Sequence, residues 1–393
     1  MRIGLFTDSY CPQVNGVATS VLMLKENLEL LGHTVFVFTT SDPSAREGES
    51  GVYRIPSVRA VAGRRLAYPP PGVMKTVASL RLDIVHTHTE FTLGLLGRKA
   101  ARKNNIPLVH TMHTIYEYYT HYIPGTRQLD TLKKGMVKKL CAAWCNSADR
   151  VIVPTRKVEQ LLSSYGVVRE TCVVATGIDI GKFRGEPGLA DAAEALRRDL
   201  WIREDDKVIV SIGRVSKEKN IEELLLAMKT YLPLRPDVRF LIVGDGPAKK
   251  HLEGMSRDLG LSERVTFLGE QPWEGIAAFY RLGHVFISAS RSETQGLTYI
   301  EALAAGLPVV AKADPCLDGT LLNGVNGYTF TDSGGMERAL DNLLYDCARY
   351  REFSNQAALS AGKFSAEHFA RAVQSVYLEA LADGADLPEE LTV

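Results

Sequence analysis

Short apolar runs alternate with longer segments of helical periodicity along the first 175 residues. The runs are bounded by polar residues or glycine, and they occupy residues 3–6, 35–38, 83–86, 107–110, 150–153 and 172–175. After the first run, apolar residues recur every three or four positions from Val17 to Leu31, and Gly32 ends this helical pattern. Strands alternating with helices predict a parallel sheet covered on both faces. We therefore expect residues 1–175 to form one doubly wound α/β domain.

The same alternation restarts after a polar, glycine-containing segment, residues 176–204. Strands are expected at residues 208–212, 239–243, 264–268, 285–288, 309–311 and 328–330. They predict a second doubly wound domain over residues 176–365, and then a helix and an acidic tail over residues 366–393 that could dock on either domain. A chain of 393 residues is too long for one ordinary core. Two such domains would face a central cleft at the carboxyl ends of their strands, where open α/β sheets bind ligands.

The turn after the strand at 285–288 carries the strongest chemical signal. Gly296, Leu297 and Thr298 stand where the next helix begins, so their backbone N–H groups suit an anionic oxygen. Glu293 precedes this turn, and Glu301 lies about one helical turn beyond it. Because carboxylates accept hydrogen bonds from vicinal hydroxyls, the stretch fits a sugar, a diphosphate and a ribose. The alternative is an ordinary βα unit with two solvated glutamates.

Two earlier turns of the same domain supply positive charge and backbone access. Arg214 follows a strand, and Lys219 begins the next helix. Together they can neutralise a diphosphate without a metal ion, the alternative being a solvated basic turn. Gly246 lies in a turn that begins like a dinucleotide-binding fingerprint, but the third glycine would fall at Lys249. That failure counts against a dehydrogenase and leaves a nucleotide-facing turn open.

Candidate residues in the first domain lie after its strands. Gly16 ends a loop with proline that leads into the first helix, so its backbone can approach a ligand closely; a tight βα turn without a ligand explains it equally well. His86 and His88 end the third strand, and His113 ends or follows the fourth. Three histidines at successive strand ends favour a functional role for His113 over a structural one.

Two basic and apolar stretches indicate a surface that meets lipid. The first is a loop at residues 59–68 with Arg59, Arg64 and Arg65. The second is a helical stripe of Leu129, Leu132, Met136, Leu140 and Trp144, flanked by Lys133, Lys134, Lys138 and Lys139. A basic amphipathic helix can lie at an anionic interface; the alternative is a core-facing stripe with a solvated lysine face. Tyr116, in a tyrosine-rich segment, lines an apolar acceptor channel or simply packs.

Composition narrows the remaining classes. Lys plus Arg and Asp plus Glu number 46 each, so no overall field recruits nucleic acid and any basic surface must be local. The six cysteines are scattered without zinc-like spacing, which is typical of a reducing cytoplasm. The N-terminus enters a strand without a signal-peptide pattern, and no run of about 18 apolar residues occurs. We expect a cytoplasmic protein that meets a membrane at its surface and needs no metal.

Taken together, these motifs resemble the family 4 glycosyltransferases of the GT-B fold over nearly the whole chain. The pair Glu293 and Glu301 resembles the family's E-x7-E element, and Arg214 with Lys219 resembles its diphosphate clamp. Gly16 resembles the loop glycine beside the phosphates, and His113 resembles the histidine near the donor sugar. The resemblance implies that Glu293 orients the sugar hydroxyls and that Glu301 binds the ribose.

Four segments narrow the resemblance further, to bacterial members of the family that glucosylate diacylglycerol. They are residues 6–20, 110–114, 292–298 and 314–319, although Met112 stands where the family often has tyrosine. This implies a retaining, metal-independent hexosyltransferase at the inner face of the cell membrane that moves glucose from UDP-glucose to the 3-hydroxyl of 1,2-diacylglycerol. Alternatives are another acceptor (monoglucosyl lipid, polyprenyl or soluble glycan), another hexose such as mannose or galactose, or a non-catalytic nucleotide-sugar sensor.

Overall fold

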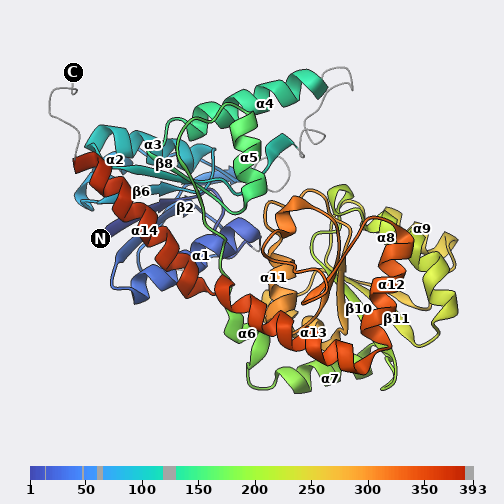
Figure 1. Cartoon of the computed structure of the whole chain (residues 1–393). Coiled ribbons are helices and arrows are strands. Elements are labelled where there is room, and N and C mark those ends of the chain that lie inside the picture. The colour runs from blue at the N-terminus through green and yellow to red at the C-terminus, as the bar shows by residue number, and fades with distance from the viewer. Residues whose placement is uncertain (14, 47, 60–64, 118–129, 386–393) are drawn as a thin grey trace. The chain divides into compact units, whose positions relative to one another are not determined.

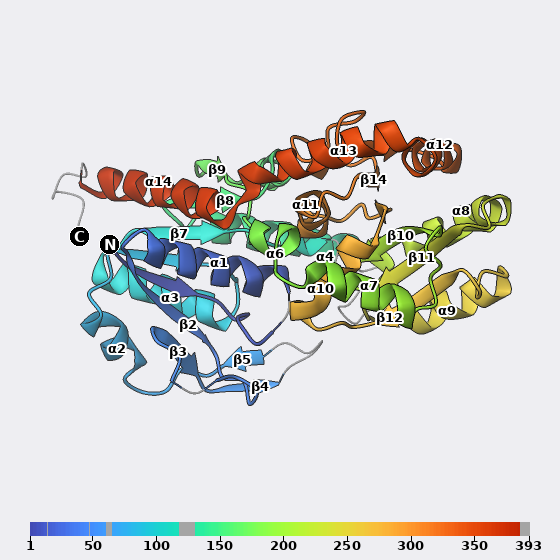
Figure 2. The ribbon, with the colours of Figure 1, turned by 90° about the horizontal axis from the view of Figure 1, so that it is seen from below.

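A computed structural model describes residues 1–13, 15–46, 48–59, 65–117 and 130–385 (Figures 1 and 2). The chain divides into two compact units. The N-terminal unit comprises Met1–Ile178 together with the last segment from Ala366, and the C-terminal unit is Asp179–Ser365. The sequence pattern places the division near residue 175, three residues earlier than the structure does. None of the described helices has the length and apolar character needed to cross a bilayer.

The N-terminal unit is built on a seven-stranded parallel sheet in the order β3-β2-β1-β6-β7-β8-β9. Its strands are β1 (Arg2–Phe6), β2 (Thr34–Thr40), β3 (Val52–Ile55), β6 (Ile84–Thr87), β7 (Leu108–Thr111), β8 (Arg150–Val153) and β9 (Thr171–Val173). Its helices are α1 (Gly16–Leu30), α2 (Val73–Ser79), α3 (Thr92–Asn104), α4 (Asp130–Cys145), α5 (Arg156–Ser164) and α14 (Ala366–Ala385).

Alternating side chains of these strands bury both faces of the sheet. On β1, Ile3 and Leu5 belong to the core cluster under α1 and α14, whereas Phe6 belongs to the cluster under α3 and α5. On β6, Ile84 and Val85 divide between the two clusters in the same way. A sheet buried on both faces requires strands that are apolar throughout. The strands therefore appear in the sequence as short continuous apolar runs.

The last helix, α14, packs on the N-terminal unit. Its side chains Val373 and Tyr377 are fully buried in one cluster with Val21 and Leu24 of α1. Figure 1 shows α14 lying along α1 after the chain has left the C-terminal unit. The sequence left this docking open, since an amphipathic helix does not itself specify which apolar surface will cover it.

The C-terminal unit contains a six-stranded parallel sheet in the order β12-β11-β10-β13-β14-β15. Its strands are β10 (Lys207–Ile212), β11 (Val238–Val243), β12 (Val265–Gly269), β13 (Val285–Ser288), β14 (Val309–Lys312) and β15 (Gly327–Phe330). Its helices are α6 (Ile180–Arg184), α7 (Leu189–Asp199), α8 (Ile221–Tyr231), α9 (Lys249–Asp258), α10 (Ile276–Leu282), α11 (Leu297–Ala304), α12 (Ser333–Leu344) and α13 (Cys347–Ser360), and η4 (Lys217–Lys219) is a short 3-10 turn.

Every strand expected from the sequence is present, whereas three short strands were missed. The edge strand β3 is only partly buried, so its apolar pattern is weak. Strands β4 (Ser57–Arg59) and β5 (Arg65–Ala67) form an antiparallel hairpin in which Arg59 pairs with Arg65. The described ends of the segment expected to be a basic loop therefore belong to the two strands of a hairpin. Arg64 lies outside the described residues.

Candidate active site

Three βα loops of the C-terminal unit lie side by side at the carboxyl ends of β10, β11 and β13. The Gly213 N–H donates to the Val243 carbonyl at 2.9 Å, and the Val215 N–H donates to the Asp245 carbonyl at 2.9 Å. A Cβ atom built on Gly213 would lie 3.9 Å from the Thr298 Cγ2 atom, in ordinary van der Waals contact. The structure thus brings the turn that carries Arg214 next to the start of α11.

Glycines make the contact between the first two of these loops possible. Gly244 has a φ of +136°, and a Cβ there would lie 2.0 Å from the Gly213 carbonyl oxygen. A Cβ on Gly246 would lie 2.3 Å from the Val215 carbonyl oxygen. Both distances are far shorter than any real non-bonded contact of a Cβ atom, so any side chain would push the loops apart. Loop packing therefore explains Gly246, whose contact with a nucleotide stays a prediction.

Lys219 and Glu293 form an ion pair at this edge of the sheet. The Lys219 Nζ atom, at the end of η4, donates to Glu293 Oε1 at 2.5 Å. Asn220 follows in the left-handed conformation that ends η4 and starts α8. Arg214, which directly follows Gly213, is exposed. Two residues predicted separately, one for a diphosphate and one for sugar hydroxyls, thus share one site.

A glycine stands at the N-cap position of α11. Gly296 precedes the helix with a φ of +80° and has no side chain to cap the first turn. A Cβ there would lie 2.4 Å from the Tyr299 ring and 3.5 Å from Glu293 Cγ. Glycine is required for both reasons. The amides of Leu297 and Thr298 follow directly, beside the Glu293 side chain.

Glu301 differs from Glu293 in being almost completely buried, with 5 % of its surface exposed. Its Oε2 atom accepts a hydrogen bond from the Tyr280 hydroxyl of α10 at 2.6 Å. Burial raises the pKa of Glu301, while the Tyr280 hydrogen bond and the positive charge of Lys182 act in the opposite direction. The alternative of two solvated glutamates is therefore wrong, because one is ion-paired and the other is buried.

Tyr280 and Lys182 are site residues that sequence reasoning missed. The Lys182 ammonium group lies 3.9 Å from the centroid of the Trp273 ring and donates to the Trp273 carbonyl at 2.7 Å. Tyr280 packs against Phe286 of β13. Neither belongs to a motif, since both reach Glu301 through the packing of α6 and α10 rather than through sequence proximity.

A cluster of histidines lies at the ends of β6 and β7 in the N-terminal unit. The Nδ1 atom of His88 is 3.1 Å from the Nε2 atom of His113. His86 is bound on both ring nitrogens, by the hydroxyls of Tyr377 and Thr111, each at 2.7 Å. The structure brings together the three histidines that the sequence singled out.

Burial keeps these rings neutral. It lowers the pKa of His86 and of His88 well below the usual histidine range, and neighbouring histidines act in the same direction. Burial also lowers the pKa of His113 to about 3. A neutral imidazole carries one N–H and one lone pair, so each ring is both a donor and an acceptor at neutral pH.

Gly16 is the first residue of α1 and is exposed. The side chain of Asn15 caps this helix by accepting from the N–H groups of Val17 and Ala18 at 3.1 and 3.0 Å. The Ser9 hydroxyl bonds the same asparagine. These bonds explain Asn15 as the cap of α1, and the contact of Gly16 with a phosphate stays a prediction.

Helix α4 turns apolar side chains toward solvent. Met136 and Leu140 are 58 % and 62 % exposed, whereas Val137, Cys141 and Cys145 on the neighbouring face pack into the core. The alternative of a core-facing stripe is therefore wrong for Met136 and Leu140. Leu129 and the side chain of Leu132 lie outside the described residues. Of the lysines, Lys134 and Lys139 are exposed, and Lys133 and Lys138 are partly exposed.

Of the remaining residues predicted to meet lipid, Arg65 and Tyr116 make hydrogen bonds within the protein. Arg59 is exposed, whereas the Arg65 guanidinium donates to the Ser57 hydroxyl at 2.9 Å and to the Ser57 carbonyl at 3.1 Å. The Tyr116 hydroxyl donates to Glu90 in a short hydrogen bond, and its ring packs against the core under α4. Packing is thus established for Tyr116, and contact with an acceptor stays a prediction.

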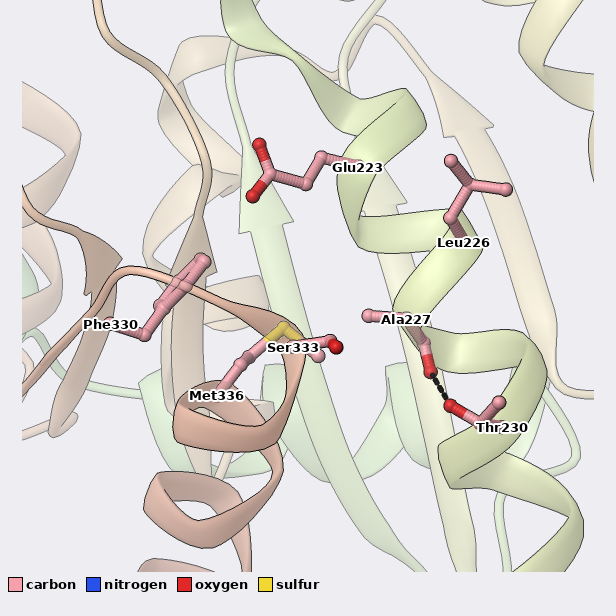
Figure 3. A pocket seen from close by; sticks show the side chains of 7 residues that line it. All are labelled: Glu223, Leu226, Ala227, Thr230, Phe330, Ser333 and Met336. Carbon is pink, nitrogen blue, oxygen red and sulfur yellow. Dashed lines mark hydrogen bonds between the residues drawn. The ribbon is translucent and has the colours of Figure 1, made fainter.

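A hollow of about 310 Å³ opens elsewhere on the C-terminal unit, between α8 and α12. Figure 3 shows Glu223 on one side of it and Phe330 with Met336 on the other. None of the residues predicted to bind substrate lines it. Within the described part of the chain, no group of three or more His, Cys, Asp or Glu side chains is arranged to hold a metal ion.

Comparison with known proteins identifies the family. The model described as Glycosyltransferase Family 4 matches residues 14–182, and the model described as Glycosyl transferases group 1 matches residues 192–360. An alpha-monoglucosyldiacylglycerol synthase of Streptococcus pneumoniae is 39% identical over 385 residues, which are 97% of this chain and 86% of that protein. The chain belongs to glycosyltransferase family 4.

Two further comparisons extend this result. An alpha-monoglucosyldiacylglycerol synthase of Acholeplasma laidlawii is 33% identical to this family 4 glycosyltransferase over 386 residues, 96% of this chain and 97% of that protein. The crystal structure of Anabaena Alr3699/HepE in complex with UDP and glucose matches with a TM-score of 0.77 at 19% identity, covering 96% of this chain and 100% of that one. The fold is GT-B, and the protein is a nucleotide-sugar-dependent glycosyltransferase.

The buried histidines predict that acid destabilises the N-terminal unit of this family 4 glycosyltransferase. Their folded pKa lies below the ordinary value of 6.5, so below pH 6.5 the unfolded chain binds protons that the folded one does not. Stability should therefore be complete above pH 6.5 and fall by up to about 1.4 kcal/mol per pH unit for each histidine as the pH drops. Hydrogen exchange of the β6 and β7 amides between pH 7.5 and 5 measures this loss.

Two variants test whether the buried histidines cause this pH dependence. His88→Leu removes one titrating group and should flatten the pH dependence, whereas His251→Gln, at an exposed position of α9, should leave it unchanged. A stability of β6 and β7 that is independent of pH over this range would contradict the assignment of buried, neutral histidines.

Proposed function

We propose that this family 4 glycosyltransferase transfers glucose from UDP-glucose to the 3-hydroxyl of 1,2-diacylglycerol, with retention of configuration at the anomeric carbon. The observation that carries the proposal is the near full-length similarity to two alpha-monoglucosyldiacylglycerol synthases. The contact of Lys219 with Glu293 beside Gly296 supports it, because it gathers the groups that such a donor needs.

The donor diphosphate binds at the start of α11 in this proposal. The Arg214 guanidinium binds its oxygens in pairs, the Lys219 ammonium supplies a point charge, and the amides of Leu297 and Thr298 donate from the positive end of the helix. Two cations and a helix N-terminus offset the diphosphate charge without a metal ion. Gly246 and Gly16 contribute backbone to the nucleotide and to the phosphates.

Two carboxylates and one histidine orient the rest of the donor. Glu293 accepts hydrogen bonds from the glucose hydroxyls while its charge is held by Lys219, and Glu301 accepts from the ribose. Glu301 keeps lone pairs beyond the one that Tyr280 occupies, so it can bind a hydroxyl without losing that contact. His113 contacts the far edge of the sugar in this proposal.

Transfer proceeds through an oxocarbenium-like transition state. The bond between the anomeric carbon and the β-phosphate oxygen breaks, and negative charge grows on the departing diphosphate. Arg214, Lys219 and the α11 amides stabilise that negative charge. These groups are held in place before the reaction begins, so they need not reorganise as the charge grows. The acceptor hydroxyl attacks from the same face, and its proton passes to the departing phosphate oxygen. The products are UDP and an α-glucosyl diacylglycerol.

The acceptor arrives from the membrane in this proposal. Helix α4 presents Met136 and Leu140 to solvent together with lysines, as an interfacial helix does when its apolar side enters the headgroup region. In this proposal Arg59 and Arg65 of the β4–β5 hairpin also meet the lipid headgroups, as does Arg64, which lies outside the described residues. The protein would then bind peripherally at the inner face of the cell membrane, with Tyr116 near the entering lipid.

Activity tests the donor site directly. Lys219→Gln and Glu293→Gln should each lower kcat for UDP release in the presence of diacylglycerol by about 10²–10³, the cost of one group that stabilises a transition-state charge. Lys217→Gln is the matched control, since Lys217 is exposed on the same 3-10 turn. A Lys219→Gln enzyme as active as the control would contradict the diphosphate site. A wild-type protein without turnover on any sugar or acceptor would favour a nucleotide-sugar sensor.

Vesicle flotation tests the membrane surface. Each cation near an anionic bilayer contributes about 1 kcal/mol, so Lys134→Gln with Lys139→Gln should weaken binding to anionic vesicles by roughly 30-fold. Lys229→Gln with Lys250→Gln removes the same charge from exposed positions on α8 and α9 and should change little. Equal flotation of both double variants would refute the role of α4.

A further inference from the structure

We propose that His88 is a positioning residue that holds His113 in the neutral tautomer with its proton on Nδ1, so that His113 offers an N–H donor to the donor sugar. The contact between His113 and a donor sugar rests on the function proposed above. The tautomer itself follows from contacts within the N-terminal unit.

The distance between the two rings requires one shared hydrogen. His88 Nδ1 and His113 Nε2 lie 3.1 Å apart, and the rings are nearly parallel with centroids 5.3 Å apart. A hydrogen bond at this distance needs a donor on one nitrogen and a lone pair on the other. Because burial lowers the pKa of both rings, each carries a single proton. The tautomer of His88 therefore dictates the tautomer of His113.

The other nitrogen of His88 decides which way the hydrogen points. His88 is 2 % exposed, and its Nε2 atom is buried without a hydrogen-bond partner among the described residues. An orphaned N–H is the rarest unsatisfied group in native interiors, so Nε2 carries the lone pair and Nδ1 carries the proton. Nδ1–H of His88 then donates to Nε2 of His113.

Neighbouring rings offer no acceptor that would reverse this assignment. The His86 ring is tilted against the His88 ring with the two centroids 4.0 Å apart, but both nitrogens of His86 already bond hydroxyls. The Trp144 indole N–H donates to His110 Nδ1 at 3.3 Å, and the Thr87 hydroxyl lies 2.9 Å from the same nitrogen. Among the described residues no group accepts from His88 Nε2, whereas His88 Nδ1 and His113 Nε2 are hydrogen-bond partners.

The consequence for His113 is a free, uncharged donor. Its Nε2 lone pair is used by His88, and its Nδ1–H has no partner among the residues that the structure describes. A neutral N–H can donate to a sugar oxygen without adding charge beside the oxocarbenium-like carbon. Without His88 the proton could move to Nε2, and Nδ1 would then require a hydrogen from the substrate instead of giving one.

Nitrogen NMR tests the tautomer independently of any activity. Two-bond ¹H–¹⁵N spectra of the full chain labelled with ¹⁵N-histidine distinguish protonated from unprotonated ring nitrogens, and His88→Leu and His113→Leu assign the signals. We expect Nδ1 protonated and Nε2 bare on both His88 and His113. A proton on Nε2 of His113 in the wild-type protein would overturn the proposal.

Kinetics tests the positioning role. His88→Leu should lower kcat by about 10–100-fold, as a misplaced contact does, with KM for UDP-glucose within about threefold of wild type. His88→Asn restores an N–H near the Nδ1 position and should recover most of kcat. Tyr377→Phe removes a buried hydrogen bond of the same cluster without touching the His88–His113 bond, so it should leave kcat unchanged.

The failures of the two proposals are distinguishable. An active wild type whose kcat survives His88→Leu, or falls equally in His88→Asn and Tyr377→Phe, would overturn the positioning role while the proposed function stands. A wild type without glucosyl transfer would defeat the proposed function, and the NMR result would still decide the tautomer.

Discussion

Fixed positive charge at the carboxyl edge of the C-terminal sheet is the constraint on which the proposed chemistry depends. Lys219 is held by Glu293 rather than left to move in solvent, and Glu293 lies against the backbone of Gly296. A cation oriented before the donor binds need not be reorganised when charge develops on the leaving diphosphate. The same contact limits how Glu293 can turn, so the sugar-binding carboxylate and the phosphate-binding ammonium are set by one interaction.

Backbone packing beneath this pair keeps it in place. Gly244 and Gly246 lie so close to the carbonyls of Gly213 and Val215 that a methyl group at either position would separate the loops. Neutral, buried histidines order the N-terminal unit by a different means, since His86 bonds two hydroxyls and His88 bonds His113. Helix α14 contributes to this cluster through the Tyr377 hydroxyl, which bonds His86.

Much of the fold was predictable because its signals are local. Apolar runs that alternate with helical periods predicted every strand of both parallel sheets except the poorly buried β3, and they missed the separate hairpin β4–β5. The motif around Glu293 was visible for the same reason, since a strand, a glycine turn and a helix are adjacent in sequence. Arg214, Lys219 and Gly296 could be expected near one sheet edge from the parallel topology alone.

What the sequence did not predict depends on contacts between distant segments. The pairing of Lys219 with Glu293 joins residues 74 positions apart, and the burial of Glu301 depends on how α6 and α10 pack. The docking of α14 on α1 and the exposure of Met136 likewise depend on which surfaces the fold leaves uncovered. Only the structure shows that Met136 and Leu140 of the predicted α4 stripe face solvent.

Calorimetric titration of UDP in the presence of EDTA tests the central claim most directly, because it isolates the diphosphate site from acceptor and membrane. A charge-assisted hydrogen bond contributes about 1.5–3 kcal/mol, so the wild type should bind UDP without divalent metal and Lys219→Gln should bind it roughly 10–100-fold more weakly. Binding that requires a divalent cation, or that is the same in Lys219→Gln and wild type, would contradict a diphosphate held by fixed protein charge.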